Sequence, residues 1–226
     1  LSGDQRLIQT YNDGLDIHTQ VASDVFKVPL DEVTYEQRYV AKYIDFGILY
    51  GRQAPSLAKG ELKCSVAEAQ TYIDEFLGAF HELRDWITDT QAQALSEGYV
   101  RSIFGRKRRF PLILSSNKHA IKNRAINTPI QSAASDICLD ALTRLQLDHL
   151  DPSTCRILLT VHDSILCETH PNHVDQNALL IQEVMEDVPL DNPPLPFKVD
   201  VDLGWRWGEM VPYEKNWREN SDLFSQ

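Results

Sequence analysis

The sequence predicts an α+β fold that is mostly helical and carries a small antiparallel sheet. Over most of residues 4–148, apolar side chains recur at the three- and four-residue spacing of amphipathic helices. Extended patterns are short, at residues 156–168 and 198–203 and in two pieces around Gly105. Long helical patterns with a few late strands, rather than a regular alternation of the two, indicate the α+β class.

Length and composition limit the classes of protein to consider. A chain of 226 residues can bury a full hydrophobic core and can form one or two domains. It has no run of 18 apolar residues, so we expect no membrane span. Its beginning, LSGDQRLIQTY, lacks signal-peptide features and an initial Met, which suggests a cut or processed chain. Four cysteines without a CxxC pair favour a reduced, intracellular protein without structural zinc: Cys64, Cys138, Cys155 and Cys167.

The net charge of −11 would argue against a nucleic-acid partner if it were spread evenly. It is not, because residues 101–124 hold eight cations and no acid: Arg101, Arg106, Lys107, Arg108, Arg109, Lys118, Lys122 and Arg124. A basic segment on an acidic body produces a directed field, which fits a protein that guides DNA along one surface. The alternative is a run of solvated surface charges, although the absence of acids favours phosphate contacts.

Helical patterns fill the first half of the chain. We expect one helix over residues 4–26, a second over 34–50 that stops at Gly51, and a third that begins with a capping box of Ser65 and Glu68. A further helix over about 82–97 ends at Gly98.

The helix over 34–50 has the most informative pattern. Arg38, Lys42, Phe46 and Tyr50 recur every four residues, and because four residues turn a helix by about 400°, they share one slowly drifting face. Two cations could bind a polyphosphate, and two rings further along could meet a sugar and a base. The alternative is a surface helix with cations outside and rings in the core.

The second half of the chain combines one long helix with extended segments. Thr128 as N-cap, Pro129 at the first helical position and Gln131 in a capping box predict a long helix over 129–148. Residues 156–168 then predict a hairpin that turns at His162-Asp163-Ser164. A helix over 172–188, a loop marked by Pro193, Pro194 and Pro196, and a strand over 198–203 follow. Because a lone hairpin is marginally stable, we expect this strand to support it, and we assign the tail after Met210 no role.

The stretch RYVAKYIDFGILYG resembles motif B of the DNA polymerase I family, family A, at all six fixed positions: Arg38, Lys42, Phe46, Gly47, Tyr50 and Gly51. Three further stretches resemble the same family, so the resemblance extends from Leu1 to about Met210. They are DIHT at 16–19, FGRKRR at 104–109 and NRAINTPIQSAASD at 123–136. The turn Val161-His162-Asp163 resembles the family's motif C.

The resemblance implies a role for each matched residue. His18, Arg38, Lys42, Phe46 and Tyr50 would bind the incoming nucleotide, and Lys42 would also act in catalysis. The implied DNA contacts are Arg106, Arg108, Arg124, Asn127, Gln131 and, at the primer end, His162. Minor-groove contacts from Arg124, Asn127 and Gln131 would check base-pair geometry without reading sequence. Gln131 could also simply cap its helix.

Asp163 is the implied catalytic and metal-binding carboxylate. Polymerisation uses two Mg²⁺ ions about 3.5–4 Å apart, and hard Mg²⁺ prefers carboxylate oxygens. The acid that usually follows this Asp in the family is Ser164 here. Motif A of the family, with the second metal-binding Asp and the Glu that excludes ribose, has no match, and neither has the thumb. We therefore expect the chain to be inactive alone, as a piece of a split or truncated polymerase whose N-terminal partner supplies motif A and thumb.

These observations predict two subdomains. Residues 1–122 would form the fingers, with the clamp helix 34–50 and the basic segment 101–124, and residues 123–226 part of the palm. The expected function is template-directed DNA synthesis from primer–template DNA and dNTPs, in the cytoplasm near the nucleoid, or in the host cytoplasm if the source is viral. The rivals are a non-catalytic nucleic-acid-binding module and a nucleotide-binding module derived from the polymerase fold.

Overall fold

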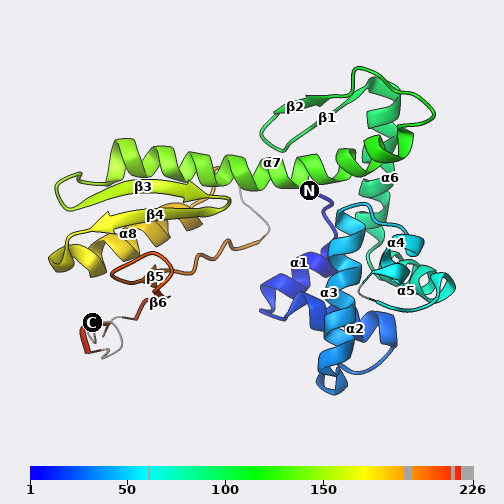
Figure 1. Ribbon diagram of the computed structural model, residues 1–226, viewed down its shortest axis with the longest axis horizontal. Coiled ribbons are helices and arrows are strands. Elements are labelled where there is room, and N and C mark those ends of the chain that lie inside the picture. The colour runs from blue at the N-terminus through cyan, green and yellow to red at the C-terminus, as the bar shows by residue number, and fades with distance from the viewer. Residues whose placement is uncertain (61, 191–194, 215–216, 220–226) are drawn as a thin grey trace. The chain divides into compact units, whose positions relative to one another are not determined.

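The computed structural model describes residues 1–60, 62–190, 195–214 and 217–219. The chain is α+β, as predicted, with helices predominating and short antiparallel strand pairs (Figure 1). It forms two compact units, residues 1–133 and 134–226, so the division falls later than the predicted boundary at 122/123.

Unit 1 begins with six helices: α1 (Gln5–Asn12), α2 (Ile17–Phe26), α3 (Tyr35–Leu49), α4 (Ala54–Lys59), α5 (Val66–Ala79) and α6 (His81–Glu97), with a 3₁₀ turn at Leu30–Glu32. The single helix expected over 4–26 is wrong. Gly14 adopts a positive φ of 68°, and the Asp16 carboxylate caps a new helix by accepting from the Thr19 backbone N–H. A left-handed residue followed by a fresh N-cap ends one helix and starts another.

The main core of unit 1 surrounds α3. Ile44 of α3 is fully buried with Val21 of α2 and with Phe76 and Phe80 of the α5 region. Gly47 permits the close approach of α4, since a Cβ there would lie 2.5 Å from Cδ2 of the buried Leu57. These contacts bury one face of α3 and leave the opposite face for function.

Asp4 joins the beginning of unit 1 to α6. Its carboxylate is buried, caps α1 by accepting from the N–H groups of Arg6 and Leu7, and also accepts from the Leu83 N–H at 3.2 Å. A buried carboxylate is tolerated when several donors satisfy it, so Asp4 fixes α1 against α6.

The basic segment contains a tight hairpin. Strands β1 (Tyr99–Arg101) and β2 (Lys107–Arg109) pair antiparallel, with Val100 opposite Arg108. This confirms the two extended pieces predicted around Gly105. Val100 and Phe110 join a second small core with Ile121 and Ala125 of the following helix, so the hairpin is packed against a rigid support.

Helix α7 (Lys118–Arg144) is continuous, with Pro129 inside it. The predicted helix start at Thr128-Pro129 is therefore wrong, whereas residues 129–148 are helical as expected, in α7 and in the π-helical turn that follows it. The Thr128 hydroxyl accepts from Arg108 Nη1 at 3.0 Å instead of capping a helix. Proline lacks the N–H of an interior helical residue, but the helix continues past it here.

Unit 2 follows α7 with a π-helical turn, Leu145–His149, and then the predicted hairpin. Strands β3 (Cys155–Val161) and β4 (Ser164–Thr169) pair with Val161 opposite Ser164, so His162 and Asp163 form the turn. A 3₁₀ turn, Pro171–His173, leads into α8 (Val174–Glu186) beside the hairpin (Figure 1). Asn177 of α8 donates to the Thr169 hydroxyl at 2.6 Å, which fixes the helix to β4.

The strand expected over 198–203 is mostly absent. Only β5 (Asp202–Leu203) forms, and it pairs with β6 (Val211–Pro212) rather than with the hairpin. Side chains of α8 bind the earlier part, because Val199 donates its N–H to Glu186 and accepts from Gln182 Nε2. In the predicted proline loop, Pro193 and Pro194 lie outside the described residues.

The tail after Met210, to which the sequence assigned no role, is bound to the first turn of α8. The Asp175 carboxylate accepts from the Tyr213 hydroxyl at 2.8 Å, from Trp217 Nε1 at 2.9 Å and from Arg218 Nη1 at 2.7 Å. Burial, followed by Asp175, raises the pKa of Tyr213 to about 12. The described part of the tail, residues 211–214 and the 3₁₀ turn Trp217–Glu219, is thus attached to α8 through Tyr213, Trp217 and Arg218.

Candidate functional site

The start of α2 and the exposed face of α3 form the first half of the candidate site. Arg38 of α3 donates from Nε and Nη2 to the two oxygens of Asp16, each at 2.8 Å, in a bidentate pair. Arg38 holds the pKa of Asp16 well below its usual range. Asp16 therefore has two tasks, because it caps α2 and fixes the orientation of the Arg38 guanidinium.

His18 lies in the first turn of α2 and contacts the same face of α3. Its ring centroid is 5.6 Å from that of Phe46, and Lys42 Nζ lies 5.9 Å from the Phe46 ring centroid. Burial lowers the pKa of His18, Asp16 opposes this, and the cations Arg38 and Lys42 lower it further. The structure thus brings His18, Arg38, Lys42 and Phe46 together, as the sequence predicted.

Asp45 lies beside this cluster, on the side of the core. Its side chain and that of His18 are each only 14% exposed, and Asp45 Oδ2 is 3.4 Å from His18 Nδ1. Burial raises the pKa of Asp45 to about 6. His18 Nδ1 is buried and makes no hydrogen bond, so a polar ring atom and a carboxylate face each other in a site where water is scarce.

The two aromatic residues of the α3 face are open to solvent. Phe46 is 44% exposed and Tyr50 is 52% exposed. The alternative interpretation of this helix, with its rings in the core, is therefore wrong for both. Tyr50 is the C-cap of α3, and Gly51 follows at a positive φ of 72°, where a Cβ would lie 2.5 Å from Asn123 Cγ.

The predicted DNA-binding residues of unit 1 lie on β2 and α7. Arg108, Arg109 and Arg124 line a small pocket of about 190 Å³ between the hairpin and the helix. Arg108 also lies 5.7 Å from the Phe110 ring. Arg106 is on the exposed turn before β2. Three arginines border this hollow together with apolar residues such as Phe110 and Leu112, and guanidinium groups can pair with anions such as phosphate.

Arg124, Asn127 and Gln131 share one face of α7. They are three and four residues apart on a continuous helix, so their side chains project from neighbouring positions. Arg124 and Gln131 are exposed, and Asn127 is half-buried. Gln131 is in the helix interior, so the alternative that it only caps a helix is wrong.

His162 and Asp163 lie at the tip of the β3–β4 hairpin in unit 2, and both are exposed. His162 adopts a positive φ of 56°, a conformation that a non-glycine residue seldom adopts outside tight turns. Burial raises the pKa of Cys138 on α7, and the nearby Asp163 charge raises it further. Asp163 thus lies near Cys138 of α7, and its side chain is exposed.

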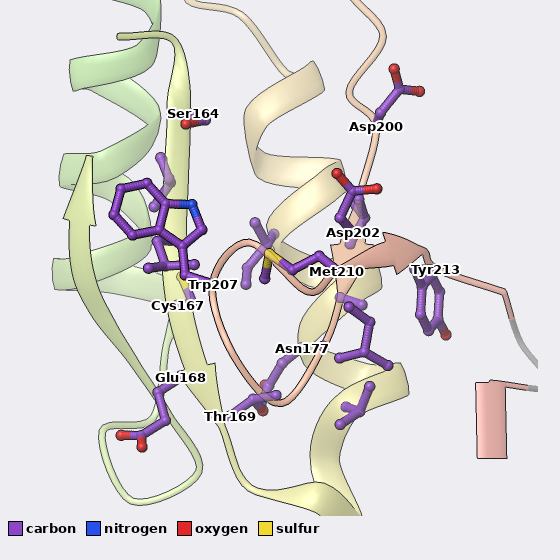
Figure 2. A pocket seen from close by; sticks show the side chains of 18 of the residues that line it. Ser164, Cys167, Glu168, Thr169, Asn177, Asp200, Asp202, Trp207, Met210 and Tyr213 are labelled. Atoms are coloured by element: carbon purple, nitrogen blue, oxygen red, sulfur yellow. The ribbon is translucent and has the colours of Figure 1, made fainter. Parts of the chain in front are cut away.

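Asp163 also borders a pocket of about 800 Å³ in unit 2. Figure 2 shows Ser164, Cys167 and Glu168 on one side of it and Asp200, Asp202 and Tyr213 on the other, with Trp207 reaching towards Cys167. No group of three or more His, Cys, Asp or Glu side chains that could hold a metal ion occurs among the residues the structure describes. Asp163 alone fits a divalent ion as one hard oxygen ligand.

The sequence interpretation missed Asp16 and Asp45, which flank the predicted nucleotide residues. Asp16 carried a local signal, since Asp followed three residues later by Thr at a helix start is typical of an N-cap. Its pairing with Arg38 joins positions 22 residues apart and has no local signal. Asp45 is three residues after Lys42, and nothing in the sequence distinguishes it from an exposed acid on a helix. Only the structure shows that its side chain is buried.

No helix within the described ranges is both long enough and apolar enough to cross a membrane. All four cysteines are free thiols.

Comparisons with known proteins agree on one family. The model of DNA polymerase family A matches residues 1–209. The thermostable DNA polymerase I of Thermus aquaticus is 37% identical over 211 residues, which are 92% of this chain and 25% of that protein. DNA polymerase I of Mycobacterium bovis is 36% identical over 213 residues, 92% of this chain and 23% of that protein.

A solved structure matches as well. The polymerase domain of Pol1 from M. smegmatis, in complex with a DNA primer-template and dNTP, is 35% identical with a TM-score of 0.78. The match covers 87% of this chain and 35% of that one. The chain spans about a quarter of the length of the curated relatives it matches. Because the family model covers most of its residues, this chain belongs to DNA polymerase family A.

Proposed function

We propose that this chain carries out the nucleotide-binding part of template-directed DNA synthesis, as the fingers and part of the palm of a family A polymerase. The observation that supports it best is the convergence of His18, Arg38, Lys42 and Phe46 on one face of α2 and α3. Three basic side chains beside an exposed ring match a substrate that joins a triphosphate to a sugar.

Arg38 and Lys42 would bind the triphosphate. Asp16 occupies Nε and Nη2 of Arg38, so the Nη1 donors of a fixed guanidinium are directed to the phosphates. Lys42 lies one helical turn before Phe46, closer along α3 than Arg38 does, and the Phe46 ring would contact the sugar. Tyr50, one turn after Phe46, would contact a base. As pyrophosphate leaves, Lys42 would neutralise the charge that develops on it and donate a proton.

The DNA would lie on the basic hairpin and α7. Arg106, Arg108 and Arg124 would contact phosphates, while Asn127 and Gln131 would accept or donate hydrogen bonds at the primer–template minor groove. His162 would contact the primer end. Such contacts bind every sequence alike, which a copying enzyme requires.

Asp163 would hold the divalent metal that family A polymerases use. The metal supplies charge stabilisation to the attacking and leaving oxygens. Asp163 would anchor it at the hairpin tip, with a further carboxylate from a motif A segment outside these 226 residues. We propose that a partner piece of the polymerase brings this segment and the thumb, and that the isolated chain is inactive.

The small β3–β4 sheet of unit 2 supports the proposal of a partner piece. The β3–β4 hairpin is a sheet of two strands, with Leu158 and Leu159 exposed on β3. Two-stranded sheets are marginally stable, and open strand edges are usually covered. Co-expression with an N-terminal polymerase piece that carries motif A should give one complex on size exclusion, and independent elution would contradict the partner.

Phe46→Tyr in the reassembled polymerase tests the central assignment. A dideoxynucleotide lacks the 3′-hydroxyl that fills the space beside the Phe46 ring, and a tyrosine hydroxyl can take its place. We therefore expect much more chain termination in a primer-extension assay with competing nucleotides, and nearly unchanged normal synthesis. Tyr72→Phe, a hydroxyl change in α5, is the control. Termination at the parental level would mean that this face of α3 does not contact the sugar.

A further inference from the structure

One contact in unit 1, between Asp45 and the Nδ1 atom of His18, has no part in the function proposed above. The carboxylate of Asp45 and the Nδ1 atom of His18 are 3.4 Å apart, both side chains are mostly buried, and Nδ1 makes no hydrogen bond. A buried polar atom without a partner costs free energy, and so does a buried carboxylate. Placing them face to face reduces both costs only if a proton lies between them.

We propose that Asp45 is a positioning residue for His18: it shares one proton with Nδ1, so that the other ring nitrogen, Nε2, carries a proton for the nucleotide triphosphate. The inference rests on the proposed nucleotide role of His18. Asp45 itself touches no substrate and acts through the imidazole.

The proton balance shows why Asp45 matters. With one proton between Asp45 and Nδ1 and another on Nε2, the ring presents an N–H donor, whether the shared proton is closer to oxygen or nitrogen. If the shared proton is lost, the carboxylate draws the remaining proton to Nδ1. Nε2 is then a bare lone pair that repels phosphate. Binding a triphosphate at near-neutral pH therefore takes up a proton from solvent.

The charges around the pair support this direction. Asp16 at the start of α2 favours the imidazolium, while Arg38 and Lys42 on α3 disfavour it. Tyr11 of α1 faces Asp45 and Asp16, and their charges help raise the pKa of its phenol, after burial. A bound triphosphate would offset Arg38 and Lys42. Burial raises the pKa of Asp45 to about 6 and lowers the pKa of His18, which brings the two groups closer in proton affinity and favours a proton shared between them.

The experiment follows the His18 ring by ¹⁵N NMR in the 226-residue chain, from pH 5 to 8, with and without dATP. In the parent we expect two coupled steps and a shift of the ring signals when dATP is added. Asp45→Asn keeps the shape but removes the carboxylate. It should give one step, with a midpoint lower by about 1 pH unit, and a dATP affinity that no longer falls as the pH rises, because an asparagine amide at this position can donate to Nδ1 and leave the proton on Nε2.

Two further measurements separate positioning from simple structural damage. Calorimetry of dATP binding in two buffers with different ionisation enthalpies should show proton uptake in the parent and in the control Glu36→Gln, which removes an exposed acid from the same helix. Asp45→Asn should abolish the uptake. In a His18→Gln background, Asp45→Asn should no longer change dATP affinity.

The outcomes are distinguishable. If dATP shifts the His18 signals and Asp45→Asn changes neither the titration nor the proton uptake, the role of Asp45 is overturned while the proposed nucleotide site stands. If dATP leaves the parent His18 signals unmoved, the nucleotide site itself is wrong, and the positioning role fails with it.

Discussion

The α2–α3 face of unit 1 and the hairpin tip of unit 2 carry the two halves of the proposed chemistry, and they are built differently. On α3, Arg38 is fixed by Asp16, His18 lies against Phe46, and Asp45 is buried behind them. At the hairpin tip, Asp163 is exposed on a two-residue turn and borders an open pocket.

This difference shows where preorganisation is already present. Side chains held by several partners lose little further freedom when a ligand binds, so the α3 face is already ordered for the nucleotide that we propose binds there. Asp163 is placed only by the hairpin, and its use as a metal ligand depends on the carboxylates brought beside it. Substitutions in unit 1 should therefore have graded effects, and the loss of Asp163 an all-or-none effect.

The largest expected effect comes from Asp163→Asn in the reassembled polymerase. Loss of the anchoring metal ligand should lower the primer-extension rate by at least ~10³, or about 4 kcal/mol of barrier. DNA affinity should be unchanged or tighter, because one negative charge is removed. Asp148→Asn, at an exposed position of the same unit, is the matched control. A rate within tenfold of the parent would remove Asp163 from the metal site.

Lys42→Ala should have the next largest effect. In the proposed role the ammonium neutralises charge that develops in the transition state, so the maximal rate should fall by roughly 10², along with nucleotide affinity. Arg38→Ala should mainly weaken nucleotide affinity, since Arg38 would bind triphosphate charge that is present in both the ground state and the transition state. Single-turnover kinetics over a range of dNTP concentrations separate rate from affinity, with Lys59→Ala as control. Equal effects of both variants on the rate alone would contradict these roles.

Asp45→Asn should change stability in a pH-dependent way. A carboxyl whose pKa is higher folded than unfolded binds more protons when folded, so the free energy of unfolding falls as pH rises. The window runs from the ordinary Asp pKa of 3.8 to about 6. Above it the variant should be more stable than the parent by up to about 3 kcal/mol, since each pKa unit corresponds to about 1.4 kcal/mol. Urea unfolding at pH 4 and pH 7 measures this, and parallel pH curves would refute it.

The smallest expected effect concerns the basic hairpin. Arg106→Ala with Arg108→Ala should weaken DNA binding for every sequence and flatten its salt dependence by about 0.9 per lost phosphate contact on duplex DNA. A titration against salt measures the slope, with Lys59→Ala and Arg84→Ala as the control pair. A slope equal to that of the parent would make the segment a solvated charge run.

Local features were predictable wherever short-range chemistry decides the structure. The capping box of Ser65 and Glu68, the end of α6 at Gly98 and the turn at His162-Asp163 all formed as expected. Each depends on a side chain that satisfies backbone groups a few residues away, or on a backbone that must reverse. The shared face of Arg38, Lys42, Phe46 and Tyr50 follows from helical geometry in the same way.

The errors arose where partners from elsewhere in the chain compete for the same backbone. Thr128 was expected to cap a helix, but it accepts a hydrogen bond from Arg108, twenty residues earlier. Residues 198–203 alternate like a strand, yet Gln182 and Glu186 of α8 bind the backbone of Val199. An alternation of apolar and polar residues indicates which face of a segment is exposed to solvent. It does not indicate which other part of the chain will form hydrogen bonds with the backbone of that segment.

The sequence by itself determined the family, the helical frame of the proposed nucleotide site and the place of Asp163 in a turn, because fixed spacings in helices and turns set which side chains share a face. Tertiary structure alone decided that Asp16 orients Arg38, that Asp45 is buried against His18, and that Asp175 holds the tail. Hydrogen bonding and burial between residues tens of positions apart depend on packing, which local spacing does not encode.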